Sequence, residues 1–255
     1  MIYTDTHTHL YDGQLNTDEE AMIQRAIDAG VTKMYMPNCD SSTVNQMLRL
    51  ADSHPLHCLP MMGLHPTYVK DNYKEELSAV QQWLSNRKFY GVGEIGLDYY
   101  WDLTFKQQQI EAFKTQIDWA LQYDLPIIIH SRESITDCIN IVRKKQNGKL
   151  KGIFHCFGSS IKEANQIIDL GLYMGIGGVV TFKKSTLPDV VKEVSLEHIV
   201  LETDAPYLAP VPFRGKRNES SYIPIIAEQI AAIKGIPVAD VAAITTQNAE
   251  KIFSN

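Results

Sequence analysis

The sequence predicts a (β/α)8 barrel of the TIM type, a single domain that covers residues 1–255. Short apolar runs alternate with longer amphipathic segments from one end of the chain to the other, as βα units around a parallel sheet do. Eight such runs can be counted, and eight βα units close a barrel. An open doubly wound sheet is the alternative, but a glycine-rich phosphate turn ordinarily follows its first strand, where this chain has His-Thr-His.

The units can be followed in order along the chain. The apolar runs predict strands at 2–7, 31–37, 57–63, 90–93, 126–129, 152–155, 172–176 and 199–202. The amphipathic segments between them predict helices at 18–29, 42–52, 74–86, 105–123, 133–144 and 162–169. The longest polar stretch, 214–221, is too short to separate two domains, and the sequence contains no repeat or low-complexity tract.

Composition restricts the partners of this chain. It has 24 Lys and Arg against 30 Asp and Glu, a net charge of −6, and so lacks the cationic field that carries extended non-specific DNA binding. The cysteines lack CxxC spacing and lie in apolar segments, which indicates reduced, packed thiols at Cys39, Cys58, Cys138 and Cys156. Because no signal-peptide or membrane-spanning apolar run occurs, we expect a soluble, cytoplasmic protein with no membrane or obligate protein partner.

Polar residues stand where the predicted strands end. A strand points every second side chain to one face, so His7 and His9 are expected to project together beside the first strand. Further polar residues follow strands three, four, five, six and eight, namely His65, Glu94, His130, His155 and Asp204. Barrel enzymes assemble their sites at these carboxyl ends. Singly, each residue has an ordinary explanation as a hydrogen-bonded rim residue or turn former, but together they indicate a metal site.

Four imidazoles and two carboxylates exceed what one tetrahedral metal uses, so we predict two divalent cations with a shared ligand. Glu94 is the expected bridge, because its flanking glycines permit close approach and its carboxylate can offer one oxygen to each ion. The predicted ligands are His7, His9 and Asp204 for one ion and His130 and His155 for the other. Asp204 would also steer the attacking water and carry its proton away.

Two further carboxylates lie close to these ligands in the sequence. Glu202 precedes Asp204 by two residues on the same strand face, and Asp5 has the same relation to His7. Both are candidates to support the site from behind, since ligating histidines usually donate their other ring nitrogen to a carboxylate. The alternative for each is a buried carboxylate that is paired within the barrel.

The predicted ligands occur within an ordered series of motifs. The series runs Asp5-Thr6-His7-Thr8-His9-Leu10, Gly63-Leu64-His65-Pro66, Gly93-Glu94-Ile95-Gly96-Leu97-Asp98-Tyr99, His130-Ser131-Arg132, His155-Cys156-Phe157, Leu201-Glu202-Thr203-Asp204-Ala205-Pro206-Tyr207 and Phe213-Arg214-Gly215-Lys216-Arg217-Asn218-Glu219. In this order it resembles the TatD family of metal-dependent deoxyribonucleases, which are amidohydrolase-like barrels. The resemblance implies phosphodiester hydrolysis by a 3′ to 5′ exonuclease that prefers single-stranded DNA. It also implies magnesium or manganese as working cations, whereas a histidine-rich site suits zinc.

Candidate substrate contacts surround the predicted metal site. The candidates for gripping phosphate oxygens are Arg132, Arg214, Lys216 and Arg217. A solvated basic loop is the ordinary alternative for this group. His65 could bind the scissile phosphate or protonate the leaving oxygen, or it could be a structural rim histidine. The aromatic residues 99–101 could stack on a terminal base, or they could pack in the core.

Two other functions remain open at the level of sequence. An amidohydrolase that opens a small amide, lactone or ester would use the same two-metal chemistry on a carbonyl carbon. A metal-stabilised binding scaffold without catalysis would use the cations only for folding energy. The basic loop favours a phosphodiester substrate over the first alternative, and ligand sets that leave a metal position open would argue against the second.

Overall fold

Strands and helices alternate along the computed structural model, which describes residues 1–15 and 17–254. The strands are β1 (Tyr3–Asp5), β2 (Val31–Pro37), β3 (Cys58–Met61), β4 (Val92–Asp98), β5 (Ile127–Arg132), β6 (Gly152–Phe154), β7 (Tyr173–Ile176) and β8 (Ile199–Leu201). The α-helices are α1 (Glu19–Asp28), α2 (Val44–Ser53), α3 (Tyr73–Asn86), α4 (Lys106–Tyr123), α5 (Ile135–Lys145), α6 (Ile161–Asp169), α7 (Leu187–Glu193), α8 (Ile223–Lys234) and α9 (Val238–Phe253). Short 3-10 turns are η1 (Gly13–Leu15), η2 (Pro66–Tyr68), η3 (Gly178–Thr181), η4 (Leu196–His198) and η5 (Ser220–Tyr222).

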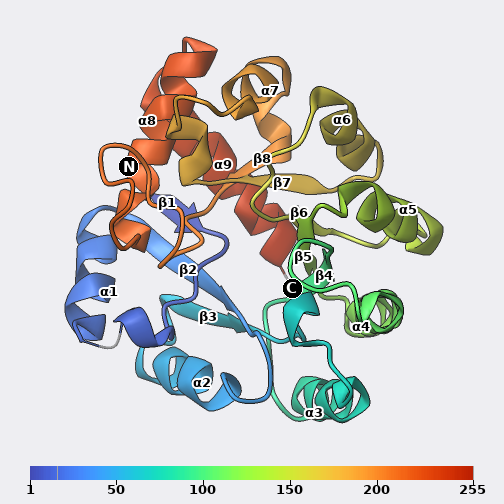
Figure 1. Ribbon diagram of the computed structural model, residues 1–255. Helices are drawn as coiled ribbons and strands as arrows, with labels where there is room; N and C mark the ends of the chain where they lie inside the picture. The colour runs from blue at the N-terminus through green and yellow to red at the C-terminus, as the bar shows by residue number, and fades with distance from the viewer. Residues whose placement is uncertain (16, 255) are drawn as a thin grey trace.

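The strands form a ring of parallel neighbours. Pairing runs β1-β2-β3 in one sheet and β4-β5-β6-β7-β8 in another. Backbone hydrogen bonds cross both seams between these sheets, from Met62 N to Gly91 O (3.1 Å) beside β3 and β4, and from Thr6 N to Leu201 O (3.0 Å) beside β1 and β8. Helices α1 to α8 surround the strands, and α9 crosses behind them (Figure 1). The predicted (β/α)8 barrel is confirmed.

Apolar side chains fill the barrel at the opposite end from the predicted site. They come from five strands and from the last turns of α9, and comprise Tyr35, Leu59, Met61, Ile128, Ile153, Val200, Ala249, Ile252 and Phe253. The Phe253 ring stacks on the Tyr35 ring with centroids 3.7 Å apart. This closure leaves the carboxyl ends of the strands as the open end of the barrel.

Two strands are longer than the sequence indicated. β4 continues through Glu94 to Asp98, and β5 continues through His130 to Arg132. These two polar residues therefore lie within strands and not after them, which corrects the predicted boundaries. The reason is that the β4–β5 pairing holds through Asp98 and Arg132, whereas apolarity alone marked the ends of the runs. Among the described residues, no helix combines the length and apolarity needed to cross a membrane.

Replacing Phe253 with alanine should destabilise the fold by about 3–5 kcal/mol, because it opens a cavity beneath a fully packed barrel. Chemical denaturation followed by circular dichroism measures the change. Leu56→Ala is the matched control, because Leu56 is 78% exposed and its truncation should change the free energy of unfolding by less than about 0.5 kcal/mol. Equal stability of the two variants would contradict the role of α9 as a plug.

Candidate metal centre

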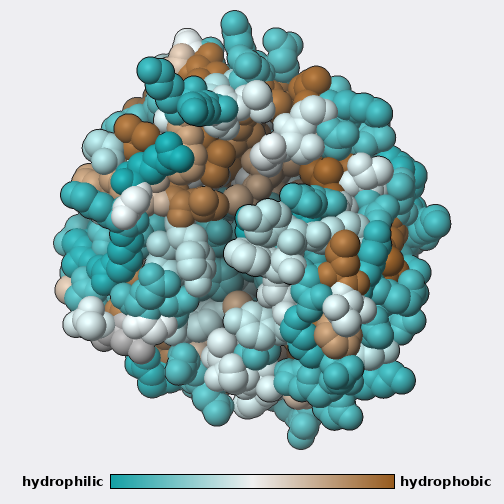
Figure 2. Space-filling view, in the orientation of Figure 1, coloured by the Kyte–Doolittle hydropathy of each residue, from teal (hydrophilic) through white to brown (hydrophobic). Residues whose placement is uncertain are grey.

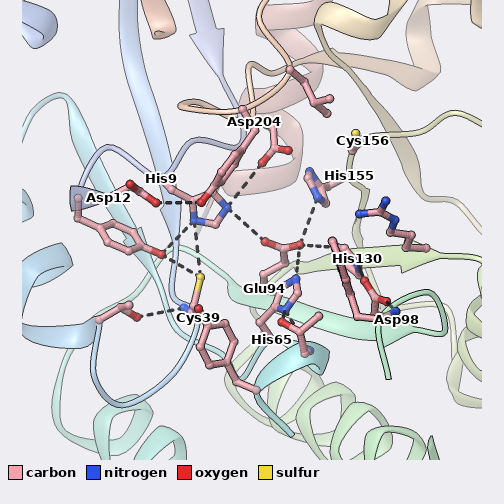
Figure 3. A pocket seen from close by; sticks show the side chains of 18 of the residues that line it. His9, Asp12, Cys39, His65, Glu94, Asp98, His130, His155, Cys156 and Asp204 are labelled. Carbon is pink, nitrogen blue, oxygen red and sulfur yellow. Dashed lines mark hydrogen bonds and ion pairs between the residues drawn. The ribbon is translucent and has the colours of Figure 1, made fainter. Parts of the chain in front are cut away.

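The open end of the barrel holds a cavity of about 780 Å³. Its lining includes most of the predicted ligands, namely His9, Glu94, His130, His155 and Asp204, and also His65. Figure 2 shows this face, where hydrophobic side chains gather on the side of the connection between β8 and α8. Figure 3 shows the polar side chains of the cavity converging on the Glu94 carboxylate.

One oxygen of the Glu94 carboxylate, Oε2, faces the two histidines that follow β1 in the chain. Glu94 Oε2 lies 3.1 Å from His7 Nε2 and 3.5 Å from His9 Nε2. Asp204 Oδ1 lies 3.7 Å and 3.6 Å from the same two ring nitrogens. The two Nε2 atoms are themselves only 3.2 Å apart. Each of the two Nε2 atoms therefore lies within 3.7 Å of both carboxylates. His7, His9 and Glu94 form one group of atoms close enough to hold an ion, and His7, His155 and Asp204 form another.

The second oxygen of Glu94 faces a different group of imidazoles. Glu94 Oε1 lies 2.9 Å from His130 Nδ1, 3.2 Å from His155 Nε2 and 3.3 Å from His65 Nε2. His65, Glu94 and His130 form one of the groups whose ligand atoms are close enough to hold an ion. From the sequence, His65 is expected only as a substrate contact or a structural rim residue. Its position beside Glu94 Oε1 is a finding of the structure.

The backbone of β1 and β8 fixes the first group. Asp204 N donates to His7 O (2.9 Å), and Asp204 itself adopts a left-handed backbone conformation (φ 57°). Such a conformation is unfavourable for a residue with a side chain and persists only where the surroundings enforce it. Here it accompanies the turn into Ala205, and the Asp204 carboxylate lies toward His9 (Figure 3).

Asp5 supports this region through the backbone and not through an imidazole. Its carboxylate accepts hydrogen bonds from Thr203 N (3.0 Å), Thr203 Oγ1 (2.6 Å) and Ser220 Oγ (2.7 Å), and it also accepts one from His7 N (3.3 Å). The expectation of a carboxylate behind the His7 ring is therefore not met by Asp5. Among the described residues, His7 Nδ1 is buried without a hydrogen-bond partner.

Glu202 lies behind the His155 imidazole, a partner that its two-residue spacing from Asp204 did not identify. Glu202 Oε1 is 3.3 Å from His155 Nδ1 and accepts a hydrogen bond from Cys156 N (2.6 Å). Gly175 makes room for this carboxylate, because a Cβ at that position would come within 1.9 Å of Glu202 Oε2. The absence of a side chain on β7 thus lets a charged group pack inside the barrel wall.

Asp98 is a functional candidate that the sequence analysis missed. Its Oδ2 lies 2.8 Å from His130 Nε2, on the side of the ring away from Glu94. A signal existed, because Glu94 and Asp98 are four residues apart and strand periodicity puts them on one face of β4. The predicted strand ended before Glu94, so that periodicity was not extended to Asp98.

His9 also has a partner on the far side of its ring. Tyr11 Oη lies 3.0 Å from His9 Nδ1 and donates its own proton to Pro37 O. A hydroxyl carries one proton, so toward His9 it acts as an acceptor, and His9 Nδ1 must carry the hydrogen. The lone pair of His9 Nε2 is then available toward Glu94 and Asp204.

Burial and the neighbouring charges have opposite effects on pKa values in this site. Burial would raise the pKa of Glu94, but the neighbouring His155, His65 and His7 hold it well below its usual value. Burial, aided by the nearby His155, lowers the pKa of His7 well below the ordinary value for histidine. Burial raises the pKa of Asp204 to about 6. The centre therefore combines an ionised carboxylate with a neutral imidazole, both of which are suited to bind a cation.

The cationic candidates divide into one inside the cavity and three outside its lining. Arg132 lines the cavity. Arg217 instead pairs with Asp18 at 2.5 Å and 2.8 Å, and the Arg214 guanidinium lies 4.6 Å from the centre of the Phe182 ring. Lys216 is not among the lining residues either. The basic segment after β8 is thus partly neutralised by Asp18, the residue before α1, which the sequence did not reveal.

The three aromatic candidates for base stacking differ in their surroundings. Tyr99 packs against the core and donates to Asp137 Oδ2 (2.9 Å). Trp101 lines the cavity and is 67% exposed, and Tyr100 beside it is 50% exposed. Core packing therefore describes Tyr99, whereas Trp101 presents its ring to the cavity and Tyr100 contacts Trp101 and Arg132, two residues that line it.

The residues at this centre fit a divalent metal. Histidine ring nitrogens and carboxylate oxygens gather around common points, and their lone pairs repel one another unless a proton or a cation lies between them. Glu94 is only 2% exposed, so water cannot supply the compensation freely. Glu94 can serve two points at once because each of its oxygens faces a separate group.

Comparisons with known proteins show which family this chain is similar to. Residues 4–254 match the family model described as TatD related DNase. The uncharacterized metal-dependent hydrolase YabD of Bacillus subtilis is 38% identical over 250 residues, which cover 98% of both chains. A protein of Erwinia tasmaniensis named 3′-5′ ssDNA/RNA exonuclease TatD is 30% identical and covers 98% of this chain and 99% of its own. The crystal structure of the TatD homologue YjjV of Escherichia coli superimposes with a TM-score of 0.93 at 29% identity, covering 99% and 98%.

Replacing Asp98 with asparagine should weaken metal binding at the His130 side by about 10- to 100-fold, because an amide nitrogen would face His130 Nε2 or the ring would turn. Isothermal titration with zinc or manganese measures the affinity. Asp102→Asn, which removes a surface carboxylate paired with Lys70, is the matched control and should leave the affinity unchanged. Wild-type affinity in Asp98→Asn would show that Asp98 does not orient the ligand.

Metal affinity should fall as the pH drops below about 6, because a proton then occupies the Asp204 carboxylate and competes with the cation. The loss due to this residue approaches about tenfold per pH unit for competition by one proton. Metal-binding titrations of the native protein and of Asp204→Asn between pH 7 and pH 5 measure this loss of affinity. The other ligands titrate in both proteins, so the difference between the two curves is due to Asp204. If metal affinity fell with pH in parallel for the two proteins, protonation of Asp204 would not be the cause of the loss.

Proposed function

This chain belongs to the TatD-related DNase family, and from that membership we propose that it is a divalent-metal-dependent nuclease that shortens single-stranded DNA from the 3′ end. The observation that carries the proposal is the Glu94 carboxylate, each of whose oxygens faces a separate group of imidazoles at the open end of the barrel. Support for the substrate comes from the Erwinia tasmaniensis relative, which is named 3′-5′ ssDNA/RNA exonuclease TatD.

The proposed ligand sets follow the two groups around Glu94. His7, His9 and Asp204 would hold one cation, His130 and His155 the other, and Glu94 both; His65 lies close enough to assist the second. Divalent cations held there would acidify water and neutralise charge that develops on a phosphoryl group. Zinc suits the imidazoles, whereas the resemblance favours magnesium or manganese in turnover.

The remaining steps belong to side chains of this protein. Asp204 would accept the proton of the attacking water, because its carboxylate faces the cavity and a pKa near 6 suits a general base at neutral pH. His65 lines the cavity opposite the Asp204 side of Glu94, where it could bind the scissile phosphate or protonate the leaving oxygen. Arg132 would contact a phosphate from the rim.

A second candidate function, hydrolysis of a small amide, lactone or ester, draws on one observation. Arg132 is the only lysine or arginine among the cavity-lining residues in the described part of the chain. A long polyanion ordinarily meets several cations, whereas a small uncharged substrate needs none. Exonuclease action reconciles this observation with DNA, because a strand end needs only a few phosphate contacts.

Purified protein should degrade a single-stranded DNA labelled at its 5′ end into a ladder when magnesium or manganese is present, and EDTA should abolish the ladder. Asp204→Asn should keep the fold and lose at least about 100-fold in rate, because the proton acceptor is gone. Gel electrophoresis of timed samples measures both. Asp118→Asn, a surface carboxylate paired with Lys145, is the matched control and should act at the native rate.

Two results would contradict the proposal. Turnover of Asp204→Asn at the native rate would remove Asp204 from proton transfer while leaving nuclease activity intact. Failure of the metal-loaded native protein to cleave any DNA, combined with hydrolysis of a small ester or lactone, would instead favour the second candidate.

A further inference from the structure

Two large rings lie in water beside the metal centre. Trp101 is 67% exposed and Tyr100 is 50% exposed, whereas Trp119 is only 8% exposed within α4. Their rings meet edge to face with centroids 4.9 Å apart. Exposed aromatic rings that adjoin a cavity are typical of binding sites, since exposing so much apolar surface has no benefit for folding. We therefore expect the two exposed rings, Trp101 and Tyr100, to contact a ligand.

A free cation lies against the same rings. The Arg132 guanidinium carbon is 3.9 Å from the centre of the Tyr100 ring and 5.2 Å from that of Trp101. Within the described chain, no recorded ion pair joins Arg132 to a carboxylate, unlike Arg217 and Arg25. A stacked guanidinium keeps its N–H edge available, and that edge matches the oxygens of a phosphate.

A single carboxylate connects this rim to the metal centre. Asp98 Oδ1 accepts hydrogen bonds from Tyr100 N (3.0 Å) and Trp101 N (3.2 Å), while Asp98 Oδ2 contacts His130 Nε2 (2.8 Å). Figure 3 shows Asp98 beside His130 at the edge of the cavity. The backbone that carries both rings is therefore held at a fixed distance from a predicted metal ligand.

We propose that Trp101, Tyr100 and Arg132 form a subsite that stacks one unpaired nucleobase and contacts its phosphate while the adjoining phosphodiester lies at the metal centre. This inference rests on the proposed nuclease function and defines its substrate more closely. Inside a duplex, neighbouring base pairs cover both faces of each base. The subsite therefore favours an unpaired strand end, whose base can turn onto the rings. Stacking accepts any base, because every base has a π-face. One base and one cation make recognition local to the strand end.

The test removes the base and the ring separately. The substrates are a single-stranded oligonucleotide and two copies with an abasic residue at the 3′-terminal or the penultimate position. For the native protein, one abasic position should lower kcat/KM by about tenfold or more, as loss of one stacked base does. Trp101→Ala should lower kcat/KM on the intact strand similarly and make it insensitive to the abasic residue. Trp101→Phe, which keeps an aromatic ring, should recover most of the native difference in kcat/KM between intact and abasic strands.

The controls separate the subsite from the metal centre. Leu103→Ala alters an equally exposed residue of the same loop and should behave as the native protein. Metal content and thermal stability of Trp101→Ala should match the native values. A native-like dependence on the base in Trp101→Ala, or an equal loss on intact and abasic strands, would overturn the subsite while leaving the nuclease function in place. Failure of the native protein to cleave any strand would overturn both.

The role of Arg132 has its own measurement. Arg132→Ala should raise KM and reduce the slope of log KM against log salt concentration by about 0.7, the value for one phosphate contact on a single strand. Lys70→Ala, which removes an exposed cation that does not line the cavity, should leave the slope unchanged. An unchanged slope in Arg132→Ala would exclude its phosphate contact.

Discussion

The shared carboxylate of Glu94 is the constraint on which this site depends. It is almost fully buried, and imidazole nitrogens from four strand ends lie within 3.5 Å of its two oxygens. Such a collection of lone pairs is unfavourable unless a cation or proton compensates it. The surrounding barrel must therefore hold the ligands rigidly, and the supporting contacts of the site can be understood as meeting that need.

The support comes from groups behind the ligands. Asp98 holds His130, Glu202 lies against His155, and Tyr11 directs the lone pair of His9. Asp5 ties the end of β1 to Thr203. Each contact joins one strand end to another or fixes a ring whose orientation would otherwise be free, which preserves affinity and geometry at a metal site.

The same arrangement connects chemistry with substrate selection. β4 carries Glu94, the proposed shared ligand, and Asp98, whose carboxylate contacts His130, and the chain then enters the loop with the exposed aromatic rings. One continuous segment thereby relates the metal centre to the proposed base subsite. The acidic net charge of the protein is compatible with DNA as substrate only if contacts stay local. Arg132, the one lysine or arginine among the described residues that line the cavity, agrees with that view.

The alternation of βα units, and hence the barrel, could be predicted from the amino-acid sequence, as could the polar residues at the strand ends, because periodicity and residue type are local properties. Sequence patterns located Glu94 and the histidines, but they ended β4 too early and so missed Asp98. The folded chain was needed to see that Arg217 pairs with Asp18 away from the cavity, that Tyr99 packs inward while Trp101 does not, and that His65 joins the second group. These outcomes depend on distances between segments far apart in the chain, which no local pattern encodes.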